Sequence, residues 1–279
     1  MRRASTCLAL LGCLAVAVPA AASADEPTVT IKKFKAFAVP IPKDPTKPSA
    51  GNYPHTGNIL PSKGGLGTAL EAEYEFEGSG YGTSPLNPKG QIPPVSGVDF
   101  FLPGGSKLHP QGFGTCTAAT LQNQGAAACP KGSAASPVGE ALGEVTIGNE
   151  PVPEKTTLQG FFAPGGTLLF YTKGDTPISL EIVSTGHYVT ASAPYGPELI
   201  TVVPPVPTLP GAPLASVRTI KIKAGAAIKK GKKLISYGTM PKKCPKGGFP
   251  VKTVVTFGGT EFGFPAKTAE ATFKSPCPK

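Results

Sequence analysis

The chain has 279 residues, with 35 Gly, 33 Pro, no Trp and a formal net charge of +10, and only 16% of its residues are charged. Gly and Pro cost roughly 1 and 3 kcal/mol relative to Ala in a helix interior, so this composition excludes a helical bundle. The sequence also lacks the three-residue Gly period of collagen, and its strand patterns favour a folded, turn-rich protein over a disordered one.

The N-terminus has the pattern of an export signal. A basic pair, Arg2-Arg3, precedes an apolar run over residues 8–18, and Ala22-Ser23-Ala24 offers a small-x-small cleavage site. The run is shorter than the roughly 20 residues that span a bilayer. Cys13 lies in a lipoprotein-like box, but the apolar run continues past it. We therefore predict removal of residues 1–24 and secretion, with association to the cell wall, in preference to a lipid anchor on Cys13, and no membrane span in the mature chain.

Short strand signals follow one another through the rest of the chain. The clearest is Leu70–Glu77, where apolar residues alternate with glutamates so that one face packs and the other faces water. Residues 40–67 are rich in Pro, Gly, Ser and Asn and predict a long surface loop. The predicted strands, in chain order, are Val29–Val39, Leu70–Glu77, Val98–Leu102, Gly143–Ile147, Leu158–Phe162, Leu168–Thr172, Ile178–Val183, His187–Ala191, Leu199–Val203, Val217–Lys223, Leu234–Tyr237, Val251–Phe257 and Ala269–Phe273.

Many short strands at close spacing, with almost no helical pattern, predict an all-β fold, either a β-sandwich or a jelly-roll-like fold. One short helix is expected in the loop between Cys116 and Cys129. It runs through Ala118–Gln122, and Gly125 is its stop signal.

The four cysteines that follow the signal predict two disulfides, because exported proteins mature in an oxidising compartment. Of the three connectivities we favour Cys116–Cys129 and Cys244–Cys277, each contributing about 3–4 kcal/mol in the chain-entropy model. A zinc site is the alternative use of four cysteines. No two of them have the two-to-four-residue spacing typical of zinc ligands, so we expect no metal.

A Pro-rich stretch, residues 204–213, predicts an extended connection between two parts of unlike charge. Residues 25–213 carry 11 Lys against 15 acidic residues, a balance of −4, whereas residues 214–279 carry 14 basic residues against 2 acidic ones, a balance of +12. We expect residues 25–203 to form the main sandwich. Residues 214–279 are expected to complete the same fold, because about 66 residues make a marginal core alone.

Several segments resemble uncharacterised secreted β-rich proteins of actinobacteria. The resemblance implies export, β structure and disulfides, and it implies no known activity. The segments that carry it are Leu102-Pro103-Gly104-Gly105, Gly112-Phe113-Gly114-Thr115-Cys116, Cys129-Pro130-Lys131-Gly132-Ser133, Lys230-Gly231-Lys232-Lys233 and Cys244-Pro245-Lys246-Gly247-Gly248-Phe249-Pro250.

Residues suited to catalysis are few. The sequence has no Gly-x-Ser-x-Gly elbow and no pair of histidines at helical metal-binding spacing, so we predict no catalytic residue, no metal and no cofactor. The histidines and aspartates available are His55, His109, His187, Asp25, Asp44, Asp99 and Asp175.

The four glutamates at positions 71, 73, 75 and 77 offer the one candidate for acid–base chemistry. Residues two apart on a strand lie about 6.6–6.8 Å apart, within the roughly 5–10 Å between the carboxylates of glycosidases. A secreted carbohydrate-active hydrolase or lyase is therefore the alternative function. We favour a solvated strand face balanced by lysines of a neighbouring strand, because four evenly spaced glutamates indicate patterning.

The lysines Lys229, Lys230, Lys232 and Lys233 predict a basic hairpin tip. Its candidate partners are acidic polysaccharide, a wall polymer or an anionic membrane surface, and the alternative is a solubilising turn that protects an edge strand. Arg218 is the only arginine after the signal, so binding should be diffuse and salt-sensitive, and specific nucleic-acid binding is not expected. The sequence thus predicts a secreted, non-catalytic protein with a structural, adhesive or envelope-binding role.

Overall fold

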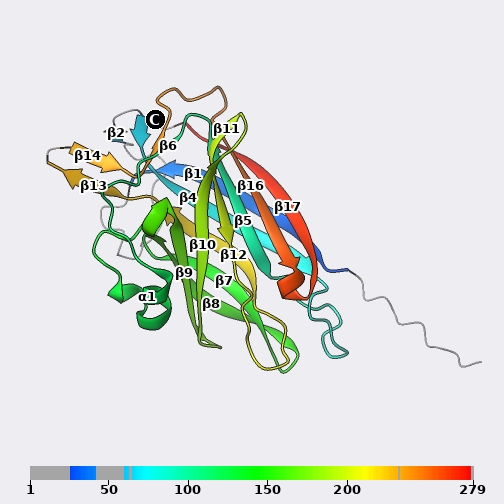
Figure 1. Ribbon diagram of the computed structural model, residues 1–279. Helices are drawn as coiled ribbons and strands as arrows, with labels where there is room; N and C mark the ends of the chain where they lie inside the picture. The colour runs from blue at the N-terminus through cyan, green and yellow to red at the C-terminus, as the bar shows by residue number, and fades with distance from the viewer. Residues whose placement is uncertain (1–25, 42–59, 63–64, 232, 278–279) are drawn as a thin grey trace, which may run out of the picture.

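A computed structural model describes residues 26–41, 60–62, 65–231 and 233–277 (Figure 1). The predicted export signal and most of the predicted loop at residues 40–67 lie outside these residues. The described part is built almost entirely of antiparallel strands with one α-helix, which confirms the all-β prediction.

The strands and the helix occupy the following positions. They are β1 (Thr28–Val39), β2 (Leu60–Ser62), β3 (Gly65–Gly67), β4 (Ala69–Ser79), β5 (Val95–Pro103), β6 (Lys107–Leu108), α1 (Ala118–Gln124), β7 (Gly139–Ile147), β8 (Glu150–Phe162), β9 (Leu168–Thr176), β10 (Leu180–Thr190), β11 (Tyr195–Val202), β12 (Ser216–Ala224), β13 (Ala227–Lys230), β14 (Lys233–Ser236), β15 (Gly238–Met240), β16 (Phe249–Gly259) and β17 (Phe264–Ser275).

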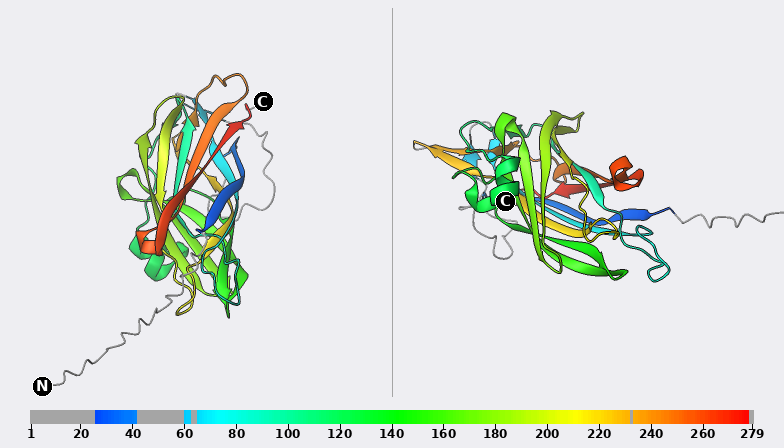
Figure 2. Two further views of the ribbon diagram at one scale, coloured as in Figure 1. Left: turned by 90° about the vertical axis from the view of Figure 1, so that its right-hand side faces the viewer. Right: turned by 60° about the horizontal axis from the view of Figure 1, so that its bottom comes forward.

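Among the described residues, eleven strands form one large sheet in the order β1-β4-β12-β7-β8-β9-β10-β11-β5-β16-β17. The sheet curls until β1 and β17 lie side by side (Figure 2). At this seam the Phe37 and Phe273 rings lie 5.2 Å apart, and the Ala38 N–H donates to Ser275 Oγ at 3.1 Å. The result is a nearly closed, barrel-like sheet with an interior.

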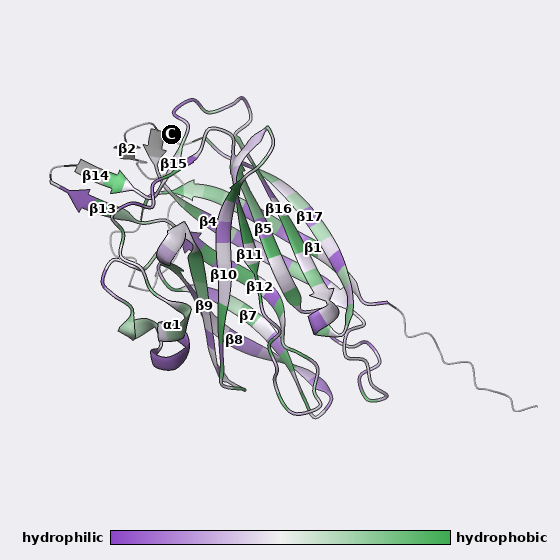
Figure 3. Ribbon diagram, in the orientation of Figure 1, coloured by the Kyte–Doolittle hydropathy of each residue, from purple (hydrophilic) through white to green (hydrophobic). Residues whose placement is uncertain are grey.

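Two small sheets lie at one end of the large sheet. One has the order β2-β3-β15-β6, and the other is the β13–β14 hairpin, which extends away from the body of the protein (Figures 1 and 2). Hydrophobic and hydrophilic residues alternate along the long strands (Figure 3), because successive side chains of a strand point to opposite faces.

One half of the interior is filled by aromatic side chains. Phe34, Tyr74, Phe76, Phe100 and Phe257 are all buried there. Ring centroids lie 5.1 Å apart for Phe34 and Tyr74, and 5.6 Å apart for Phe76 and Phe257. Aromatic pairs at such distances add to the gain from burial, so this cluster forms the main core between β1, β4, β5 and β16.

The helix α1 covers the outer face of β8, β9 and β10. Thr117 caps it by accepting a hydrogen bond from the Thr120 N–H, and Gly125 ends it with a φ of 76°, a conformation that glycine adopts without strain. Leu121 is fully buried against Phe161 and neighbouring strand residues. The prediction of a short helix in this loop is confirmed.

Two disulfides join Cys116 to Cys129 and Cys244 to Cys277, the pairings expected from the sequence. Within the part of the chain that the structure describes, no helix has the length and apolar character needed to cross a membrane.

The predicted strands are all present, with three differences. The runs Ile178–Val183 and His187–Ala191, predicted as two strands, fall mainly within the single long strand β10, because no turn interrupts them. Most strands are also longer than predicted, and the short strands β2, β3, β6, β13 and β15 were not predicted at all. Strands from residues 214–279 belong to the large sheet: β12 lies between β4 and β7, and β16 lies beside β5.

Candidate ligand-binding cavity

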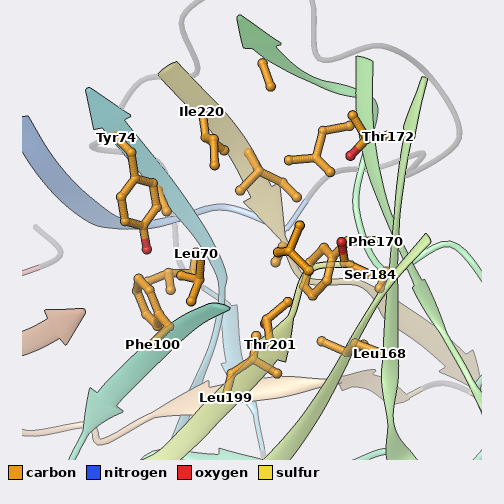
Figure 4. A pocket seen from close by; sticks show the side chains of 18 of the residues that line it. Leu70, Tyr74, Phe100, Leu168, Phe170, Thr172, Ser184, Leu199, Thr201 and Ile220 are labelled. Atoms are coloured by element: carbon orange, nitrogen blue, oxygen red, sulfur yellow. The ribbon is translucent and has the colours of Figure 1, made fainter. Parts of the chain in front are cut away.

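The interior of the large sheet contains a cavity of about 260 Å³. Its wall is mainly apolar, and Figure 4 shows side chains from several strands converging on a common space. One residue from each of β4, β5, β9, β10, β11 and β12 illustrates the wall: Leu70, Phe100, Phe170, Ser184, Leu199 and Ile220.

The cavity exists because small residues occupy interior positions of the sheet beyond the aromatic cluster. Larger side chains at these positions would fill the space. The small residues that line it include Ala72, Ala141, Gly143, Ser184 and Ala224. An eight-stranded barrel has an interior that side chains can just fill, and wider sheets enclose more volume. Eleven strands therefore enclose more space than these small side chains occupy.

Among the described residues, Glu154 of β8 is the one carboxylate in the cavity wall, and it is fully buried. Its Oε2 atom accepts a hydrogen bond from the Ile178 N–H at 3.0 Å. Its Oε1 atom has no hydrogen-bond donor among the described residues. A Cβ atom at Gly174 would lie 2.5 Å from this oxygen, so a glycine on the neighbouring strand β9 makes room for the carboxylate.

Glu154 faces the interior beside Gly143 of β7 and Val217 of β12. Glu154 pairs with Gly143 in the sheet, and Gly143 pairs with Val217, so these three residues share one face. A Cβ at Gly143 would lie 3.2 Å from the Ser216 carbonyl oxygen and 3.5 Å from Glu154 Cβ. Ser216 itself pairs with Glu144, so its side chain points to the opposite face, and it lines the cavity through its backbone.

The opposite end of the cavity carries two tyrosines, Tyr188 and Tyr237. Their hydroxyls share a hydrogen bond. Burial raises the pKa of Tyr237 to about 12, and burial together with Tyr237 raises the pKa of Tyr188 well above its usual value. Both phenols are therefore neutral hydrogen-bonding groups near pH 7. The Tyr237 ring packs 4.5 Å from that of Phe162.

The four glutamates of β4 lie on the outer face of the sheet. Lysines of both neighbouring strands pair with them: Lys32 with Glu75 at 3.0 Å, Lys33 with Glu73 at 3.0 Å, Lys221 with Glu73 at 3.6 Å and Lys223 with Glu71 at 3.2 Å. Among the described residues, the lining of the cavity includes none of these glutamates.

At the Glu71 end, this row of glutamates is buried rather than solvated. Glu77 is exposed, whereas Glu71 and Lys223 are 2% and 4% exposed and form a buried ion pair. Burial lowers the pKa of Lys223, against the opposing attraction of Glu71. The expectation of lysine partners is therefore met, but the burial of Glu71 was not expected.

The predicted basic tip lies on the β13–β14 hairpin, in which Lys230 pairs with Lys233. Lys229 and Lys230 are exposed, while Lys232 and the side chain of Lys233 lie outside the described residues. Figure 3 shows β13 as hydrophilic, on the hairpin that extends away from the body of the protein. The hairpin lysines are separate from the cavity, whose lining includes none of the described ones.

The other histidines and acidic residues lie apart from one another. No group of three or more His, Cys, Asp or Glu in the described residues is arranged to hold a metal ion. His109 lies in the loop after β6 and His187 lies on β10, whereas His55, Asp25 and Asp44 lie outside the described residues.

Asp99 and Glu198 form a weak acidic cluster on the outer face of the sheet. Burial raises the pKa of Asp99, opposed by His187. The pKa of Glu198 is raised first by burial and then by the charge of Asp99, with Lys252 opposing. The cluster lies outside the cavity.

Glu154 was not among the candidate site residues predicted from the sequence. The predicted strand Leu158–Phe162 began too late to include Glu154, because Pro151 and Pro153 weaken the strand signal before it. Alternation along β8 places Glu154 on the same face as Leu158, so a longer strand would have revealed an acidic residue on an inward face.

No protein-family model, no curated protein and no solved structure matches this chain. The geometry of the cavity is therefore the basis for a functional proposal.

Proposed function

We propose that the protein binds a small, predominantly apolar molecule inside the large sheet. The observation that carries the proposal is the cavity of about 260 Å³ whose wall is apolar and has few polar groups. Ligand pockets of proteins have this character, with volumes of about 300–1,000 Å³, so this cavity suits a ligand at the small end of the range. We infer that the protein acts as a binding or carrier protein, and its disulfides suit an extracellular location.

The ligand can be sized by comparison. A dry cavity of about 150 Å³ in another protein holds benzene, so 260 Å³ corresponds to roughly ten non-hydrogen atoms. 1-Octanol, with nine non-hydrogen atoms, is therefore a suitable neutral probe. We expect a dissociation constant between about 1 µM and 1 mM, or about −8 to −4 kcal/mol, within the limit of about −1.5 kcal/mol per atom.

Isothermal titration of the full chain with 1-octanol tests the proposal. Ser184→Leu adds bulk to the cavity wall and should abolish binding, because the larger side chain occupies the space of the ligand. Thr185→Leu is the matched control, since the neighbouring side chain is exposed and points to the opposite face. Absence of octanol binding, or equal binding by both variants, would contradict the proposal.

A second candidate is polyanion binding by the hairpin. Lys229 and Lys230 are exposed on an arm that extends from the body, and no described carboxylate pairs with either. This arrangement suits acidic polysaccharide or a wall polymer, bound through diffuse attraction. Binding to purified wall polymer should weaken with salt and with joint replacement of the four hairpin lysines by Ala; binding that survives both would rule this role out.

A further inference from the structure

The cavity contains an acidic group that no described residue neutralises. Glu154 is fully buried, and no Lys, Arg or His of the described residues forms an ion pair with it. An isolated charge inside a protein is costly, and a buried carboxylate is normally paired with a cation or fully hydrogen-bonded. Glu154 has one hydrogen bond, from the Ile178 N–H, and its Oε1 atom is left without a donor.

The surroundings hold this carboxylate in place. The Ile178 N–H fixes one oxygen, and Gly174 leaves the space that the other oxygen occupies. Glu154 Oε1 is therefore a buried acceptor without a donor among the described residues, in a mainly apolar wall. Such a group calls for a ligand that donates a hydrogen bond to it.

We propose that the bound molecule carries a protonated primary amine, which donates to Glu154 Oε1 while its apolar body fills the cavity. An ammonium group has three donors and a positive charge, which suits a carboxyl partner, whereas an alcohol has one donor and a carboxylate has none. This inference rests on the proposed function and adds the chemical class of the head group.

The test compares three probes with the same eight-carbon chain, namely 1-octylamine, 1-octanol and octanoate, by calorimetry with the full chain at pH 7. Hydrogen bonds to charged groups contribute more than neutral ones. We expect 1-octylamine to bind about 10- to 100-fold more tightly than 1-octanol, and octanoate to bind most weakly.

Glu154→Gln should reduce the preference for 1-octylamine over 1-octanol to less than about threefold. Glu150→Gln is the matched control, because Glu150 lies on the same strand with an exposed side chain, and it should keep the full preference.

The outcomes separate this inference from the function on which it rests. If 1-octanol binds and 1-octylamine binds no more tightly, the head-group assignment is wrong and the apolar binding site stands. If no probe binds, both fail. If Glu154→Gln weakens all three probes equally, Glu154 is structural and the assignment is overturned. The comparison of probes on the unaltered protein holds even if a variant does not fold.

Discussion

The buried ion pair between Lys223 and Glu71 should be a major contributor to stability, and Lys223→Met tests this. The two charged atoms lie 3.2 Å apart, with side chains that are 4% and 2% exposed. At an effective dielectric constant of about 20, Coulomb's law gives an attraction of about 5 kcal/mol at this distance. Removal of one partner of a buried pair typically costs about 3–5 kcal/mol, because the other charge stays buried.

The free energy of unfolding, measured by urea denaturation at pH 7, should therefore fall by about 3–5 kcal/mol in Lys223→Met. Replacing both partners, in Glu71→Leu/Lys223→Met, should restore at least half of the loss, because no buried charge remains. Lys221→Met is the control, since Lys221 is 44% exposed and its pair with Glu73 should contribute less than about 1 kcal/mol. A loss below 1 kcal/mol in Lys223→Met would show that the pair is solvated and that the argument fails.

Three further predictions concern other parts of the fold. Loss of the Cys244–Cys277 disulfide should lower the free energy of unfolding by about 4 kcal/mol, and loss of Cys116–Cys129 by about 3 kcal/mol, because the closed loops span 33 and 13 residues. Calorimetric unfolding of the two double Ser variants measures both losses, and the reverse order would contradict the prediction. Asp99→Asn should lower the pKa of Glu198, as followed by carbon NMR of its carboxyl group, because the charge of Asp99 helps to raise it; an unchanged pKa would count against this coupling. Since both folded-state pKa values are raised, the stability that these carboxyls contribute is present below their ordinary pKa values and is lost as the pH rises through the raised ones. Gly174→Ala should lower the free energy of unfolding by about 1–3 kcal/mol, because the new Cβ would lie 2.5 Å from Glu154 Oε1. Adding Glu154→Ala should restore part of this loss in urea denaturation. If it restores none, the clash does not involve Glu154.

Local features of the fold could be predicted because they depend on neighbouring residues. The capping oxygen of Thr117 and the positive φ of Gly125 fix the ends of α1 within eight residues of one another. The alternation of apolar residues and glutamates in β4 likewise determines which face of that strand packs inward. These signals are short-range, and the sequence contains them in full.

The cavity could not be predicted in the same way, because it depends on pairings between distant segments. Ile220 of β12 faces it only because β12 inserts between β4 and β7, which are distant from it in the chain. The role of Glu154 depends on the same long-range arrangement. Its side chain is buried because neighbouring strands enclose it, and Gly174 on β9 provides the space for its carboxylate.

A crystal structure of the protein grown with 1-octylamine decides whether the interior is a binding site. We expect density for the alkyl chain between Leu70, Phe100 and Leu199, with the nitrogen within about 3.2 Å of Glu154 Oε1. Density only on the outer surface, or an interior in which side chains close the cavity and leave no room for the chain, would contradict the proposal.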